Sequence, residues 1–147
     1  MQSDQDIAHV MTRRAFIESL YKAFFNGQED CISYGIRKGW LEFEDELYSD
    51  EPVLRKNEAR ILHMFLLKEL GIKDLQDIQK AGELRDLYDC RVCANHVAQV
   101  YLRGIMDAGD IAVKGGFLWF GLEGEDDVTR INEHIRRLQE LSDRLVN

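Results

Sequence analysis

Proline and cysteine are both scarce in this sequence. One proline occurs in 147 residues, and the three cysteines are an odd number. A proline-rich linker and a small fold built around disulfides are therefore excluded. Basic residues are also outnumbered, with 19 Lys and Arg against 27 Asp and Glu, which gives a formal net charge of −8. Because binding to phosphates needs positive charge, we do not expect nucleic acid to be a partner.

Long hydrophobic runs are missing as well. No stretch of the sequence is apolar over the roughly 20 residues that a membrane-spanning helix needs, so we do not expect membrane insertion. The first residues, Met1 to Asp6, lack the basic and apolar segments of a signal peptide. The sequence as given therefore predicts a cytoplasmic protein. If a leader had been removed, the cell surface would be the expected location.

What the sequence does contain is helical periodicity within one domain, residues 1–147. Apolar residues three and four positions apart predict helices over 12–25, 30–38, 51–70, 74–80, 89–106 and 128–145. We expect Asp50 to cap the third helix and Pro52 to lie in its first turn. Residues 42–51 are interpreted as an acidic loop. Short β-rich runs around Gly115-Gly116 predict one hairpin within 111–120, so the expected fold is mainly α with this hairpin.

Short phrases recur along the chain, which indicates an internal repeat. Three predicted helices open on related sequences, Thr12-Arg13, Leu54-Arg55 and Val128-Thr129-Arg130. Two other predicted helices end on a glycine followed by an apolar residue, Gly39-Trp40 and Gly104-Ile105. We therefore divide the chain into a half repeat 1–26, a repeat 27–70, a connecting helix 71–82 and a repeat 83–147.

This repeat resembles the S-layer homology (SLH) module of bacterial surface proteins. In that family an Asp-containing lead-in precedes a helix ending in Gly-Ile, and a second helix opens on Pro-Ile-Thr-Arg-Ala-Glu. The matching phrases here are Leu84 to Leu87 around Asp86, Gly104-Ile105, Pro52 to Arg55 and Val128 to Arg130. Leu54 stands in place of the family's Thr, and Ala15, Asn57 and Asn132 stand in place of its Glu. These replacements leave the capping box incomplete in all three units.

The resemblance implies a pseudo-trimeric cluster of helical repeats. Its grooves would bind cell-wall polysaccharide, often pyruvylated, with the motif arginines Arg13, Arg55 and Arg130 facing an anionic group at a helix N-terminus. Alternatively, each arginine is solvated or pairs with a neighbouring carboxylate. Trp40 and Trp119 are the aromatic side chains expected to stack on sugar rings. Their alternative role is to fill the core beside their loops.

A cluster of possible metal or redox ligands lies in the helix predicted for 89–106. Cys90, Cys93 and His96 share or adjoin one helical face, and a zinc site could use them with Cys31 as fourth ligand. No second ligand cluster supports zinc, so we favour no metal and no cofactor. A redox role needs a depressed thiol pKa, which the nearby Asp86 and Asp89 oppose. We therefore expect Cys93 to be a reduced core residue, Cys90 to be partly buried and His96 to make a polar contact.

No pattern in the sequence indicates an enzyme. No Ser or Cys is spaced with a His and an acid as a nucleophile requires, and no phosphate-binding glycine loop occurs. We therefore predict a non-catalytic binding module, whose first expected partner is cell-wall glycan or another envelope component. The alternatives are a cytosolic protein-interaction module with an SLH-like fold and a small zinc-stabilised domain. The half repeat also allows a homodimer.

Overall fold

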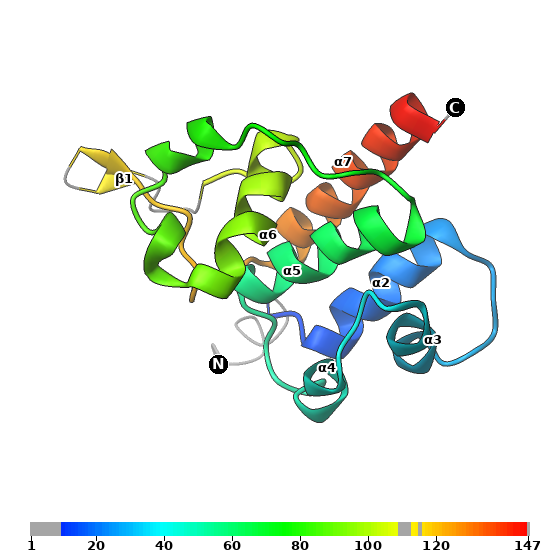
Figure 1. Cartoon of the computed structure of the whole chain (residues 1–147). Helices are drawn as coiled ribbons and strands as arrows, with labels where there is room; N and C mark the ends of the chain where they lie inside the picture. Colours follow the sequence, from blue (N-terminus) through cyan, green and yellow to red (C-terminus); the bar gives the residue numbers. More distant parts are fainter. Residues whose placement is uncertain (1–9, 109–112, 115, 147) are drawn as a thin grey trace. The chain divides into compact units, whose positions relative to one another are not determined.

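The computed structural model describes residues 10–108, 113–114 and 116–146, and it is mainly α-helical, as predicted (Figure 1). The chain divides into two compact units rather than one domain. Unit 1 joins residues 1–53 to residues 125–147, and unit 2 comprises residues 54–124. The predicted repeat boundaries near residues 26, 70 and 82 coincide with neither junction, because the last helix packs in the same unit as the first described helix. The pseudo-trimeric arrangement stays a prediction.

Unit 1 is built around helix α2, Arg13–Phe24. The helix α7, Val128–Val146, packs against α2, and so do the shorter helices α3, Cys31–Lys38, and α4, Phe43–Leu47. The side-chain amide of Gln139 donates a hydrogen bond of 2.8 Å to the carbonyl oxygen of Ala23, which fixes α7 along α2. Fully buried apolar residues of α2 supply the core at positions Phe16, Ile17 and Leu20.

Unit 2 is built around the packing of α5, Arg55–Met64, against α6, Arg91–Leu102. The helix α5 continues into a π-helical turn, η1, Phe65–Glu69, and two short 3-10 helices precede α6: η2, Gln79–Glu83, and η3, Leu87–Asp89. The predicted hairpin is present as β1, Val113–Lys114, paired antiparallel with β2, Phe117–Leu118. None of the described helices is both long and apolar enough to cross a membrane.

The repeated glycine phrase forms the same helix end in both units. Gly39 after α3 and Gly104 after α6 adopt positive φ angles, 91° and 76°, that favour glycine. In each case the backbone N–H of the next residue returns to the carbonyl oxygen five positions earlier, from Trp40 to Gly35 at 3.0 Å and from Ile105 to Val100 at 2.9 Å. These hydrogen bonds satisfy carbonyls that the helix end leaves without partners. Trp40 and Ile105 are both buried, so each glycine turns an apolar residue into the core.

Two of the helix starts that differ from the sequence prediction change the role of a capping or first-turn residue. The helix α2 begins at Arg13 with Thr12 as its cap, because the Thr12 hydroxyl accepts a hydrogen bond of 3.1 Å from the backbone N–H of Ala15. The helix α5 begins at Arg55 rather than near residue 51. Asp50 therefore caps no helix there. Pro52 instead lies in an isolated antiparallel bridge with Thr12, where its missing N–H is tolerated.

One predicted loop and one predicted helix were also wrong. The acidic segment 42–51 contains the helix α4, because the side chain of Asp45 accepts a hydrogen bond of 2.8 Å from the Glu42 backbone N–H and closes its first turn. The predicted helix 74–80 is mostly irregular, and only η2 forms at its end. Side-chain bonds from α6 bind residues 73–75 in place of a helical ladder.

Candidate functional site

The motif arginine of α2 is buried inside unit 1. The guanidinium of Arg13 donates to Asp45 Oδ1 at 2.9 Å and lies 3.5 Å from a carboxylate oxygen of Glu44. It also stands over the ring of Tyr48, 6.0 Å from the centroid. The backbone N–H of Arg13 binds the carbonyl oxygen of Glu51 at 2.9 Å. The prediction that Arg13 faces a solvent-filled groove is therefore wrong, and its alternative of pairing with a carboxylate is confirmed.

The motif arginine of α5 is buried in unit 2 and binds backbone carbonyls. Arg55 Nε donates to the carbonyl oxygen of Phe120 at 2.9 Å, and a second guanidinium nitrogen donates to that of Asp107. The guanidinium also lies over the Phe120 ring, 4.5 Å from its centroid. Asp86, in the predicted lead-in, accepts from the N–H groups of Phe120 at 2.8 Å and Gly121 at 2.9 Å. Arg55 therefore binds a carbonyl oxygen of the loop that contains Phe120, and Asp86 binds backbone N–H groups of the same loop. Arg55 is buried and does not line an open groove.

The remaining predicted ligand residues are distributed between the units. Arg130 lies half-buried in the first turn of α7 in unit 1, where Asp127 caps the helix by accepting from the Arg130 backbone N–H at 2.8 Å. Trp40 is buried in unit 1, as its core alternative predicted. Trp119 is half-buried in unit 2, directly after β2. Within either unit, the described residues form no set of motif arginine and tryptophan open to a sugar.

An exposed apolar surface lies on α4, where the sequence predicted only a solvated loop. The side chains of Phe43 and Leu47 are 77% and 74% exposed, and Tyr48 after the helix is exposed as well. The one buried residue of this helix is Asp45, at 0% exposure, in its ion pair with Arg13. The usual amphipathic arrangement is therefore inverted, with an acid inside and the apolar residues in water. We call this the α4 surface and define it by Phe43, Glu44, Glu46, Leu47 and Tyr48.

A disulfide opens helix α6 in unit 2. Cys90 and Cys93 are bonded to each other, with Cys90 as the N-cap and Cys93 in the first turn. Both residues are half-buried, which corrects the prediction of a reduced core cysteine at position 93. With the sulfurs bonded to each other, neither is a thiolate that could hold zinc. Cys31 is a free, buried thiol on α3 of unit 1, and burial raises its pKa.

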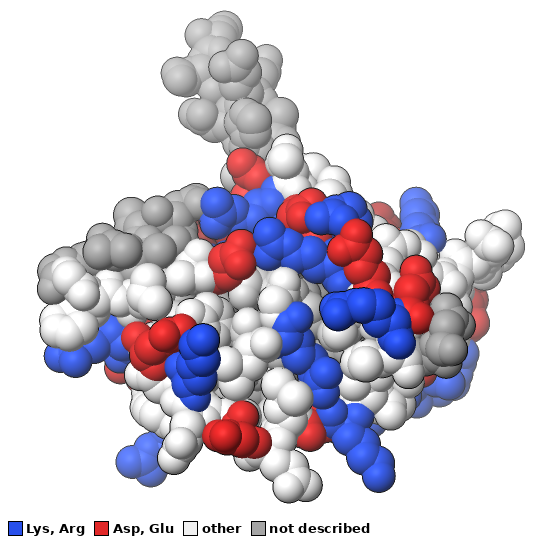
Figure 2. Space-filling model, turned by 90° about the horizontal axis from the view of Figure 1, so that it is seen from above, with Lys and Arg blue, Asp and Glu red and all other residues white. Residues whose placement is uncertain are grey.

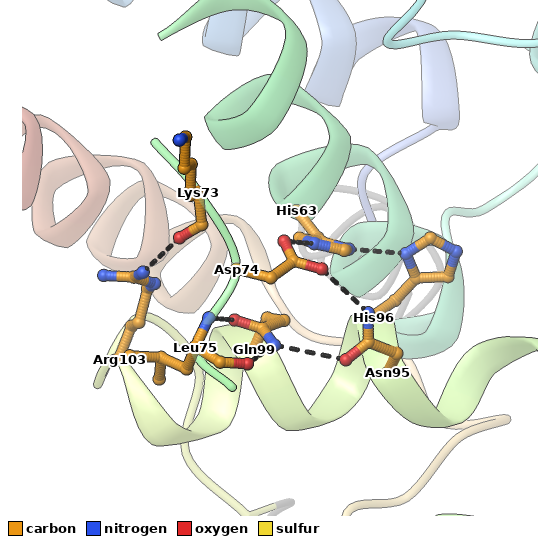
Figure 3. Close-up of polar contacts among 8 residues, drawn as sticks. All are labelled: His63, Lys73, Asp74, Leu75, Asn95, His96, Gln99 and Arg103. Carbon is orange, nitrogen blue, oxygen red and sulfur yellow. Dashed lines mark hydrogen bonds and ion pairs between the residues drawn. The ribbon is translucent and has the colours of Figure 1, made fainter. Parts of the chain in front are cut away.

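A chain of polar side chains connects α5, the segment 73–75 and α6 in unit 2 (Figure 3). His63 Nε2 lies 2.7 Å from Asp74 Oδ1, and His63 Nδ1 lies 2.7 Å from His96 Nδ1. Because a carboxylate oxygen only accepts, His63 donates from Nε2 to Asp74. The contact between the two imidazoles confirms the polar role expected for His96.

Amide side chains complete this network and connect residues 73–75 to α6. Asn95 donates to Asp74 Oδ2 at 3.0 Å, and Gln99 exchanges hydrogen bonds of 2.8 and 3.0 Å with the backbone N–H and carbonyl of Leu75. Burial, together with the charges of His63 and Arg60, lowers the pKa of His96 to about 4. Burial acts to raise the pKa of Asp74, but the hydrogen bonds from His63 and Asn95 outweigh it and lower that pKa. His96 is therefore neutral and Asp74 is anionic near pH 7.

The structure also brings together residues that could contribute to a metal site. In unit 1, Asp126 and His134 are both buried, and Asp126 Oδ2 lies 3.9 Å from His134 Nδ1. Carboxylate oxygen and imidazole nitrogen are ligand types that divalent transition metals accept. Sequence spacing gave no signal here, because the acid precedes the helix and the histidine lies two turns along it.

Basic and acidic side chains lie interspersed on the face of the molecule drawn in Figure 2, so this face carries no large patch of one charge.

Comparison of the chain with family models, with curated proteins and with solved structures gave no match in any of the three.

Proposed function

We propose that this chain is a non-catalytic protein-interaction module. Its α4 surface in unit 1 binds a polypeptide segment that carries apolar side chains flanked by Lys or Arg. The observation that carries the proposal is the orientation of α4, which buries Asp45 and exposes Phe43 and Leu47. Exposed apolar residues of this size, grouped on one helix, are typical of an interaction site.

The orientation of α4 is fixed by polar contacts, so the apolar residues cannot turn inward. Asp45 is held by the Arg13 guanidinium at 2.9 Å and by the Glu42 backbone N–H at 2.8 Å. Rotating Phe43 into the core would break the buried ion pair between Asp45 and Arg13. Breaking a buried ion pair is strongly unfavourable. The helix therefore presents Phe43 and Leu47 to solvent as a stable feature.

Charge around the α4 surface favours a basic partner. Residues 42–54 contain six acidic residues and no Lys, Arg or His, and the exposed members are Glu42, Glu44, Glu46, Asp50 and Glu51. A partner segment with Lys or Arg would be attracted to this rim, whereas an acidic polysaccharide would be repelled. The cell-wall glycan that the SLH resemblance implies is therefore the weaker proposal for this surface.

The test uses the full chain and two synthetic helical peptides. One carries leucines four positions apart flanked by lysines, and the other carries glutamates at the lysine positions. We expect fluorescence anisotropy to show saturable binding of the basic peptide, weakened by salt, and none of the acidic one. Replacing both apolar residues, Phe43→Ser with Leu47→Ser, should weaken the binding about tenfold or more, which is the scale for losing central contact residues.

Leu145→Ser is the control, because Leu145 is an exposed apolar residue on α7 that lies outside the α4 surface. This variant should bind the basic peptide like the original chain. The proposal is overturned if neither peptide binds, if both bind equally, or if the control loses as much affinity as the α4 variant. Retention on purified cell-wall polysaccharide that persists in the α4 variant would assign glycan binding to another surface and also overturn it.

A further inference from the structure

The disulfide in unit 2 lies at the N-terminus of a helix, a position that stabilises a cysteine thiolate. Cys90 is the N-cap of the twelve-residue helix α6, and Cys93 lies three residues later in its first turn. The first N–H groups of a helix have no intrahelical partner, and the helix dipole places partial positive charge there. A thiolate released at Cys90 on reduction is stabilised by both effects.

Asp86 and Asp89, the acidic residues expected to oppose such a thiolate, are either bound to other groups or exposed to solvent. The carboxylate of Asp86 is buried and accepts hydrogen bonds from the backbone N–H groups of Phe120, Gly121 and Leu122, at 2.8, 2.9 and 3.4 Å. Its charge is therefore compensated by that loop. Asp89 is exposed, so solvent and salt screen it. Arg91, also exposed, adds a positive charge directly after Cys90.

The surroundings of the disulfide are open and apolar. Val92, between the two cysteines, is 84% exposed, and Tyr88 just before them is 66% exposed. Neither side chain contributes to the core of unit 2, although the neighbouring Leu87 is fully buried. An exposed valine and tyrosine beside a half-buried disulfide give an approaching polypeptide apolar surface to contact next to the sulfur atoms.

We propose that Cys90–Cys93 is a redox-active disulfide that exchanges with a dithiol on a partner protein, which docks on Tyr88 and Val92. A thiolate of the partner attacks one sulfur, the S–S bond breaks, and the other cysteine leaves as a thiolate and takes a proton from solvent. The second partner thiol loses its proton and attacks the partner sulfur of the mixed disulfide, which releases the remaining cysteine of this chain. The partner becomes a disulfide, and two electrons and two protons reach Cys90 and Cys93.

The first test measures the equilibrium on the unmodified full chain. The protein is incubated in glutathione buffers, starting from both the oxidised and the reduced form, then quenched in acid, alkylated and mapped by mass spectrometry. We expect Cys90 and Cys93 to change together and reversibly over about a thousandfold range of the glutathione ratio, while circular dichroism stays constant. Resistance to glutathione until the protein unfolds would show a structural disulfide and overturn the proposal.

The second test separates docking from chemistry. The reductants are dithiothreitol and a synthetic peptide dithiol flanked by apolar residues. Replacing Tyr88 and Val92 by serine should leave the rate with dithiothreitol within about twofold and slow the peptide about fivefold or more, as expected for lost contact residues. Equal slowing of both reductants, or of neither, contradicts the docking role.

Leu145→Ser is the control for this second test, because Leu145 is an exposed apolar residue of unit 1 that belongs to neither proposed surface. It should leave both exchange rates unchanged, and slowing by this variant would also overturn the proposal. The double variant Phe43→Ser with Leu47→Ser tests the α4 surface separately, by peptide affinity. Failure of the redox proposal and failure of the interaction proposal therefore give different results.

Discussion

The two units use the same residue at the same helix position and surround it differently. Arg13 and Arg55 are each the first residue of a helix, each is buried, and each stands over an aromatic ring. In unit 1 the Arg13 guanidinium pairs with the carboxylate of Asp45, and in unit 2 the Arg55 guanidinium donates to the backbone carbonyl oxygens of Phe120 and Asp107. The same sequence phrase thus places an arginine that holds a neighbouring segment at a helix start, through a carboxylate in one unit and through backbone carbonyls in the other.

The largest expected effect is a difference between the two arginines. Arg13→Met leaves Asp45 buried and charged, so we expect a loss of about 3–5 kcal/mol in the free energy of unfolding. Arg55→Met removes the donors to the carbonyl oxygens of Phe120 and Asp107, and the expected loss is about 1–3 kcal/mol. Urea unfolding monitored by circular dichroism measures both values.

The double variant Arg13→Met with Asp45→Leu is the control for this comparison. It removes both charges together, and it should recover most of the stability that Arg13→Met loses. A loss from Arg55→Met that equals or exceeds the loss from Arg13→Met would contradict the distinction between the units.

A second comparison uses acid, because unit 2 carries the His63–Asp74–His96 chain. The pKa of His96 is about 4 in the fold against 6.5 for the free group, so the unfolded chain binds more protons between these values. Stability is fully present above about pH 6.5 and is lost as pH falls toward 4. The lowered pKa of Asp74 acts in the same direction further into acid. We expect the free energy of unfolding of unit 2 to fall by about 1–2 kcal/mol between pH 7 and 5. The expected value is at the lower end for such a pKa difference, because solvent reaches the half-buried His96 ring.

Hydrogen exchange with peptide resolution checks this acid effect. Protection of the α6 amides should fall more between pH 7 and 5 than protection of the α2 amides, after correction for intrinsic exchange. His96→Gln should remove much of the difference, since glutamine does not titrate. Equal loss of protection in both helices would show that the histidine chain is not the cause.

The smallest expected effect concerns the helix ends that the units share. Gly104→Ala and Gly39→Ala force alanine into a left-handed backbone conformation, and each should cost about 1 kcal/mol. A Cβ at Gly104 meets no atom within 4 Å, so its cost comes from the backbone alone. Gly82, whose φ is not positive and whose Cβ position is also open, is the control, and Gly82→Ala should be close to neutral. Thermal unfolding measures all three, and a neutral Gly104→Ala would contradict the shared helix end.

Local features were predictable from the sequence because their physics is local. Gly39 and Gly104 end helices through their backbone conformation and through hydrogen bonds within six residues. The repeated glycine phrase in the sequence therefore predicted the same helix end in both units. The predicted start of the first helix at residue 12 was one residue early, because Thr12 has an extended backbone and caps the helix with its side chain.

Features that depend on distant residues were not predictable in the same way. Phe43 and Leu47 have the spacing of a buried helical face, and only the pairing of Asp45 with Arg13, 32 positions away, turns that face outward. His63 and His96 are 33 residues apart, and nothing in either neighbourhood marks them as partners. The Cys90 and Cys93 spacing was visible, but whether the sulfurs are joined depends on redox chemistry as well as position.

Unit 1 is assembled from the two ends of the chain, with unit 2 inserted between them. During synthesis, every residue of unit 2 is added to the chain before the residues of α7. The side of α2 that α7 covers therefore lacks this partner until residues 128–146 have been made. The inserted unit has no such delay, because its residues form one continuous segment. The order of translation thus favours completion of unit 2 first, and the nineteen-residue helix α7 then completes unit 1.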